Sequence, residues 1–108
     1  MKVLLDECVP KALRSMLAGF ETYTAEQMGW KAVKNGPLLA LAEQGGFPVF
    51  ITSDKNLRYQ QNLATREIGI IELPTNRLSI VHKLGPQIAG ALKTIRSGQY
   101  IRIELPRE

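Results

Sequence analysis

The chain has 108 residues, 44% hydrophobic and 22% charged, with 14 basic and 10 acidic side chains and a formal net charge of +4. This length suits a single domain with its own core, expected to span residues 1–108. Its one cysteine, Cys8, excludes an intrachain disulfide and a cysteine-based zinc site. No apolar run approaches the roughly 20 residues that span a bilayer, and no secretory signal is visible, so we expect a cytoplasmic protein without a membrane partner.

The first part of the chain alternates apolar strands with helices. A continuous apolar run at residues 2–5 predicts a strand that is covered on both faces. Pro10 suits the first turn of a helix, and apolar residues recur at helical spacing from there until Gly19. Residues 20–24 are rich in β-forming side chains and predict a second strand, followed by a helical turn at 25–30.

The middle of the chain repeats this pattern. A basic loop at residues 31–36 leads to a helix that begins at Pro37 and ends at residues 45–46, which are both glycine. Residues 49–52 predict a third strand, because they are apolar and β-branched or aromatic. A short helix is predicted over residues 55–64.

The last third contains the longest helical pattern. Residues 68–73 predict a fourth strand, and residues 79–97 an amphipathic helix. A Gly-Pro pair at 85–86 interrupts that helix, and a proline inside a helix costs roughly 3 kcal/mol, so we expect a kink or two helices. Residues 100–105 predict a final edge strand. The alternation indicates a three-layer α/β/α domain with a mostly parallel sheet of about five strands.

The chain has only two aspartates, and each follows a predicted strand. Asp6 follows the first strand, and Asp54 follows the third. In an open parallel sheet, ligands bind beyond the carboxyl ends of the strands, so the two acids converge if their strands are neighbours. Such carboxylates are typical ligands of Mg²⁺. In the alternative, Asp6 caps the turn into the following helix, Glu7 is solvated, and Asp54 caps the helix at 55–64.

Basic residues are predicted around the same strand ends. Lys31, Lys34, Lys55 and Arg58 fall in the loops and the helix start at this edge, where they could contact phosphates without reading sequence. A solvated rim without a partner is the alternative, because the total charge is modest. Trp30 could stack a base, but packing against the edge of the core is the favoured interpretation.

Three segments resemble the short PIN-like domain family. They are Leu-Leu-Asp-Glu-Cys-Val-Pro at residues 4–10, the helix that follows Asn35, and Thr-Ser-Asp-Lys-Asn-Leu at residues 52–57. Their order and spacing match along essentially the whole chain. The resemblance implies a Rossmann-like parallel sheet and a ribonuclease site that depends on Mg²⁺ or Mn²⁺. Members are often the toxin of a bacterial toxin–antitoxin pair and often dimerise, so RNA, an antitoxin protein and a second copy of the chain are the implied partners.

The resemblance also assigns individual site residues. Asp6 matches the first-strand aspartate of the family and Glu7 the glutamate that often follows it. Asp54 matches the first acid of a Thr-x-Asp-x-Asp-Phe motif, in which Asn56 replaces the second aspartate. Asn35 lies where the family usually has an acid before its central helix.

These departures change the expected metal site. An amide oxygen can bind a hard cation but brings no charge, so two amides in place of two acids predict weaker Mg²⁺ binding. The implied enzyme is an endoribonuclease with catalytic Asp6, Glu7 and Asp54. Its metal shell is Asp6, Asp54, Asn35 and Asn56. Its substrate contacts are Lys34, Lys55, Arg58 and Ser53. The alternative is a catalytically inactive PIN-like module that binds a partner protein or RNA.

Overall fold

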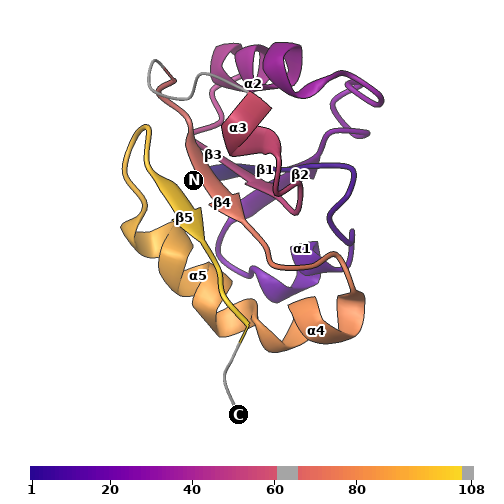
Figure 1. The fold of residues 1–108 in the computed structure, drawn as a ribbon, viewed down its shortest axis with the longest axis vertical. Helices are drawn as coiled ribbons and strands as arrows, with labels where there is room; N and C mark the ends of the chain where they lie inside the picture. The colour runs from indigo at the N-terminus through magenta and orange to yellow at the C-terminus, as the bar shows by residue number, and fades with distance from the viewer. Residues whose placement is uncertain (61–65, 106–108) are drawn as a thin grey trace.

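The computed structural model describes residues 1–60 and 66–105, which form a five-stranded sheet with helices on both faces (Figure 1). All neighbouring strands are parallel, in the order β2-β1-β3-β4-β5. The predicted three-layer α/β fold with a five-stranded sheet is therefore confirmed, and the sheet is entirely parallel. The strands are β1 (Lys2–Leu5), β2 (Glu21–Thr24), β3 (Val49–Thr52), β4 (Gly69–Glu72) and β5 (Tyr100–Arg102).

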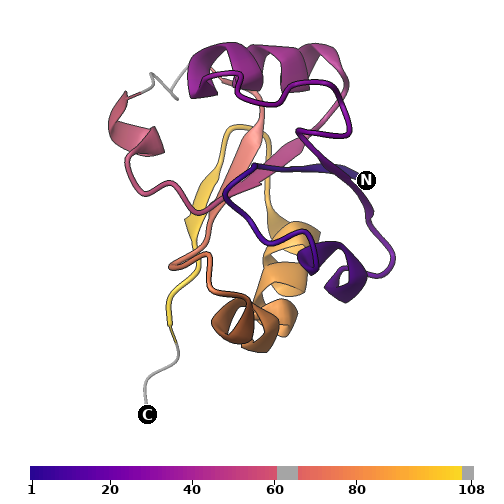
Figure 2. The ribbon, with the colours of Figure 1, turned by 90° about the vertical axis from the view of Figure 1, so that its right-hand side faces the viewer.

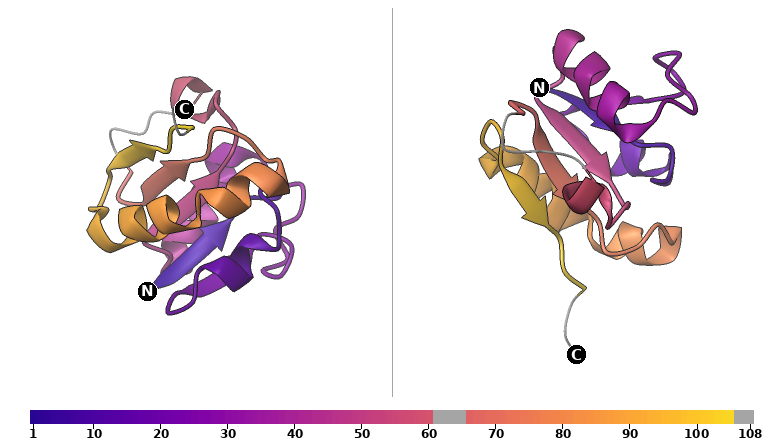
Figure 3. Two further views of the ribbon diagram at one scale, coloured as in Figure 1. Left: turned by 90° about the horizontal axis from the view of Figure 1, so that it is seen from below. Right: turned by 45° about the horizontal axis from the view of Figure 1, so that its top comes forward.

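The helices divide between the two faces of the sheet. Figure 2 shows α2 and α3 above the sheet and α1, α4 and α5 below it, and Figure 3 gives the same arrangement from two other sides. Among the helices that the structure describes, none has the length and apolar character needed to cross a membrane. The helices are α1 (Leu13–Met16), α2 (Asn35–Gln44), α3 (Leu57–Gln60), α4 (Leu78–Lys83) and α5 (Gly85–Thr94).

The alternation of side chains along each strand creates two cores. Leu4, Phe50 and Ile70 belong to the core under α2 and α3. Their neighbours along each strand belong to the core under α1, α4 and α5. Because successive side chains point to opposite faces, the residues two positions after these three also lie on the α2 and α3 face, at the carboxyl edge of the sheet. Those residues are Asp6, Thr52 and Glu72.

Several elements are shorter than predicted. The helix expected from Pro10 onward is reduced to α1, because Leu13 bonds to the carbonyl of Pro10 three residues back, which is the tighter 3₁₀ pattern. The helix expected at 55–64 appears as α3, and residues 61–64 lie outside the described part of the chain. The last strand ends at Arg102 rather than at residue 105.

The predicted break in the C-terminal helical pattern is confirmed. Helix α4 ends at Lys83, and α5 begins at Gly85 with Pro86 in its first turn, where a missing N–H costs nothing. The apolar stripe of this segment remains continuous across the break, since Val81, Leu84 and Ile88 are all buried in the same core.

Candidate functional site

The fold brings Asp6 and Asp54 to one place. Strands β1 and β3 are neighbours, with Leu5 level with Ile51, and the N–H of Asp6 donates to the carbonyl of Ile51 over 2.9 Å. The chain leaves β1 toward β2 on one side and leaves β3 toward β4 on the other. In open α/β sheets this point of divergence is the crevice where ligands bind.

Thr52 links the two acids. Its hydroxyl donates to Oδ2 of Asp6 over 2.8 Å and accepts from the backbone N–H of Asp54 over 3.0 Å. The Thr52 side chain is 0% exposed, so these bonds are made without competition from water. Thr52 was not among the site residues expected from the sequence. The missed signal was a hydroxyl at the last position of a buried strand, two residues before the acid.

Asp54 uses both of its carboxylate oxygens. Oδ1 accepts from the backbone N–H of Asn56 over 2.9 Å, which closes a local turn just before α3. Oδ2 accepts from Nδ2 of Asn35 over 3.0 Å. Asn35 opens α2, so this bond fixes the start of α2 at the crevice. Asn35 therefore reaches the site through its side chain, whereas Asn56 is exposed and reaches Asp54 through its backbone.

Glu7 is exposed, as the alternative expected, and also makes two hydrogen bonds. Its Oε1 accepts a hydrogen bond from the backbone N–H of Ala32, and its own N–H donates to Oδ1 of Asp6 over 2.8 Å. Ala32 adopts a φ of 64°, a left-handed conformation that is rare for residues other than glycine. Glu7 thus ties the loop after Trp30 to the end of β1.

A cavity of about 180 Å³ adjoins Asp6 and Glu7. Asp6 and Glu7 line it together with Thr24, Lys11 and Lys31. Ordinary small-molecule sites measure roughly 300–1,000 Å³, so this cavity has room for one chemical group of a larger ligand. Glu26 also lines it and forms an ion pair with Lys11 over 2.8 Å, so three carboxylates and two lysines surround this cavity.

Cys8 is part of the polar site. Its Sγ lies 3.4 Å from Oδ2 of Asp6 and 3.7 Å from Oγ1 of Thr52, and it accepts from the N–H of Ser53 over 3.4 Å. It is half-buried and also packs against the core under α1, α4 and α5. Ser53, a predicted substrate contact, directs its hydroxyl at the carbonyl of Cys8, 3.5 Å away.

The predicted basic contacts divide into two groups. Lys34 and Lys55 are exposed and adjoin Asn35 and Asp54 in the chain, so they lie at the crevice. Arg58 is half-buried on α3. Its charge acts on the hydroxyl of Tyr100 in β5 and favours the ionised form, which lowers the pKa of that hydroxyl.

A buried acid that the sequence did not single out lies further along the same edge. Glu72, at the end of β4, is 3% exposed. Its Oε1 accepts from the hydroxyl of Tyr100 over 2.6 Å, and its Oε2 accepts from Nε of Arg102 over 3.3 Å. Burial, and then the bond to Glu72, raise the pKa of Tyr100 far above its usual range, while the charges of Arg58 and Arg102 act the other way. The sequence signal for Glu72 was a charged side chain at the last position of an otherwise apolar strand.

The donor set limits the kind of metal that the site can hold. Mg²⁺ is often bound by one or two carboxylates, with waters and substrate phosphate completing its shell. Asp6 and Asp54 supply that pair, and the Asn35 amide adjoins it. Within residues 1–60 and 66–105, no group of three or more His, Cys, Asp or Glu residues could hold a metal ion. Asp6 and Asp54 are therefore two hard oxygen donors, fewer than a full protein cage requires.

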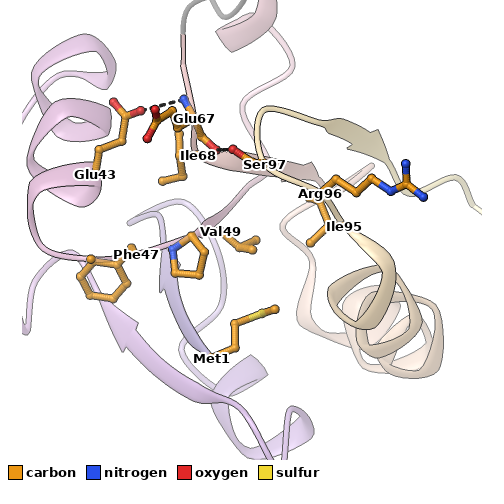
Figure 4. Close-up of a pocket in the computed structure, with 11 residues that line it drawn as sticks. Met1, Glu43, Phe47, Val49, Glu67, Ile68, Ile95, Arg96 and Ser97 are labelled. Carbon is orange, nitrogen blue, oxygen red and sulfur yellow. Dashed lines mark hydrogen bonds between the residues drawn. The ribbon is translucent and has the colours of Figure 1, made fainter.

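Two other features lie outside the site. Trp30 packs edge-on against Phe47, with ring centroids 6.1 Å apart, so the expected packing role is confirmed. A cavity of about 310 Å³ lies at the opposite, amino-terminal edge of the sheet, between Phe47, Ile68 and Ile95 (Figure 4). The figure shows Glu43, Glu67 and Ser97 on its polar side.

Comparison with known proteins adds no relative to this picture. No family model, curated protein or solved structure matches the chain. Fold and site together define a parallel α/β protein with two aspartates at the carboxyl ends of β1 and β3, joined through Thr52. Any function must be argued from these residues.

Proposed function

We propose that this protein is a PIN-like endoribonuclease that depends on a divalent metal and acts in the crevice between β1 and β3. One observation carries the proposal: Asp6 and Asp54 meet there through the buried hydroxyl of Thr52. The exposed Lys34 and Lys55 support a polyanionic substrate, because lysines beside a metal site contact phosphates without regard to sequence.

Each residue of the crevice has a distinct task in phosphodiester hydrolysis. A cation held by Asp6 and Asp54 would neutralise the phosphate oxygens and lower the pKa of the attacking water. Thr52 fixes the orientation of Asp6, and Asn35 fixes that of Asp54. Glu7 holds the Ala32 loop beside the cavity next to Asp6. Hydrolysis breaks one P–O bond, and water supplies the hydroxyl and the proton to the two products.

The resemblance to PIN-like domains extends the proposal to a cellular role. A cytoplasmic ribonuclease of this kind would be the toxin of a toxin–antitoxin pair, held inactive by an antitoxin protein. A small neighbouring gene for a DNA-binding protein, and a complex of the two products after co-expression, are the expected observations.

The test is cleavage of a mixed single-stranded RNA pool in Mg²⁺ and in Mn²⁺. Wild type is compared with Asp6→Asn and Asp54→Asn, after thermal unfolding has verified that both variants fold. Glu21→Gln is the matched control, since it neutralises an exposed acid at the opposite edge of the sheet. Cleavage that requires the metal, disappears in both aspartate variants and persists in Glu21→Gln supports the proposal.

The second candidate is a catalytically inactive module that binds a partner protein or RNA. Two contacts favour it: the amide of Asn35 donates to Asp54 where a further acid would strengthen metal binding, and the Ala32 N–H engages Glu7. In that case wild type cleaves no RNA and Mn²⁺ leaves its unfolding temperature unchanged. Those two results together would refute the ribonuclease.

A further inference from the structure

The carboxyl edge of the sheet carries a second polar group on the same face as the aspartates. The register places Thr52 level with Glu72, and Glu72 level with Arg102. Asp6 joins this row through its bond to Thr52. The row therefore crosses the sheet from β1 through β3 and β4 to β5.

Arg102 is the exposed end of this row. Its side chain is 51% exposed, whereas its partner Glu72 is 3% exposed. Only Nε of Arg102 bonds to Glu72, and the described residues offer no further hydrogen bond to the guanidinium. The terminal amino groups of Arg102 are therefore exposed to solvent. Tyr100 donates a hydrogen bond to the other carboxylate oxygen of Glu72 and so restrains the carboxylate that holds Arg102. Arginine held in this manner suits bidentate recognition of phosphate.

We propose that Arg102 binds a backbone phosphate of the RNA substrate, with Glu72 and Tyr100 as its positioning residues. The inference rests on the proposed function in taking RNA as the ligand. Three strand spacings separate Asp6 from Arg102, which is roughly 14 Å. A span of this length is longer than a dinucleotide bound at the aspartates covers. The substrate is accordingly a single strand that runs from the end of β1 across β4 to β5.

If Arg102 only formed a structural salt bridge with Glu72, RNA binding would not depend on Arg102. The first variant is Arg102→Gln. The double variant Glu72→Gln/Arg102→Gln is the second, because it leaves no buried carboxylate without its partner and keeps the net charge of wild type. Arg96→Gln is the matched control, since Arg96 lies beside the cavity at the opposite edge of the sheet (Figure 4).

The first measurement is binding of a single-stranded RNA of about ten nucleotides in EDTA, as a function of salt. We expect the slope of log K against log[salt] to fall in magnitude by about 0.7 in both Arg102 variants and to stay at the wild-type value in Arg96→Gln. The second measurement is cleavage in Mn²⁺. Both Arg102 variants should raise KM for this RNA at unchanged kcat, and leave cleavage of a dinucleotide unchanged, since it cannot reach β5.

The outcomes separate this inference from the ribonuclease proposal. If wild type cleaves RNA and all variants share one salt slope, Arg102 is no phosphate contact and the ribonuclease stands. If wild type cleaves nothing but the slope depends on Arg102, the phosphate contact stands and the ribonuclease falls. Equal effects on the dinucleotide and the longer RNA, or no RNA binding by wild type, would also overturn the inference.

Discussion

The Thr52 hydroxyl donates a 2.8 Å hydrogen bond to Oδ2 of Asp6 across the junction of β1 and β3. The same hydroxyl accepts from the N–H of Asp54, so one buried side chain sets the positions of both aspartates. The relative placement of the acids is therefore a property of the sheet and not of a surface loop. Rigid placement of this kind is what a metal site with few protein ligands requires.

Removing the Thr52 hydroxyl should loosen this arrangement. Thr52→Val keeps the shape of the side chain but leaves the Asp54 N–H without its acceptor, at a cost of about 1–3 kcal/mol in the free energy of unfolding. Thr52→Ser keeps the hydroxyl and loses about 0.8 kcal/mol for one methyl group. Urea unfolding measures both. A Val variant no less stable than the Ser variant would show that the bridge contributes little.

Mn²⁺ should stabilise the folded protein through Asp6 and Asp54. A ligand at about 100 times its Kd adds roughly 2.7 kcal/mol to the free energy of unfolding. Thermal unfolding with Mn²⁺ and with EDTA measures this difference. The increment should vanish in Asp6→Asn and in Asp54→Asn and persist in Glu21→Gln. Stabilisation that survives in either aspartate variant would place the metal elsewhere.

Asn35→Asp should lower the stability of the metal-free protein and raise its affinity for Mn²⁺. The Asn35 amide donates to Oδ2 of Asp54 over 3.0 Å, and a carboxylate there would replace an attraction by repulsion between like charges. In EDTA the variant should unfold at a lower temperature than Asn35→Ala, which loses the bond without adding charge. In Mn²⁺ the order should reverse, because site charge strengthens the binding of hard cations. An unchanged order in Mn²⁺ would argue that Asn35 does not face the cation.

Tyr100 should make the protein sensitive to alkali. Burial and the bond to Glu72 raise the pKa of its hydroxyl above the usual value of 10.0. The folded state therefore holds this proton more tightly than the unfolded state. The resulting stability is complete below pH 10 and is lost as the pH rises from there toward the folded-state pKa.

Tyr100→Phe removes this term, so above pH 10 wild type should lose stability more steeply than the variant. Urea unfolding across a pH series measures the two slopes. Tyr23→Phe, on the opposite edge strand, is the control and should follow wild type. Parallel curves for wild type and Tyr100→Phe would mean that the hydroxyl is equally acidic in both states.

The parts of the site that depend on chain order could be predicted from the sequence. Asp6 and Asp54 each follow an apolar strand, and a parallel sheet gathers the ends of its strands at one edge, so their meeting required only that β1 and β3 be neighbours. The break at Gly85 was equally visible, because the chemistry of proline acts locally.

Contacts between distant segments were not predictable. The bond from Asn35 to Asp54 joins a helix start to a strand end, and its direction depends on the packing of α2. The partners of Glu72 lie 28 and 30 residues further along, in a strand whose register no local pattern sets. The first helix was overestimated because apolar spacing does not distinguish an α-helix from successive 3₁₀ turns.

The position of β3 in the middle of the sheet governs how the protein can be made. Asp6, Asn35, Thr52 and Asp54 all lie in the first half of the chain, yet β3 receives its second set of ladder bonds from β4. A chain that stopped at residue 60 would carry every one of these groups and leave Val49–Thr52 as an open apolar edge. Such edges join other chains. Interrupted synthesis would therefore give an aggregating fragment, and the crevice is secured only after the second half of the chain has been added.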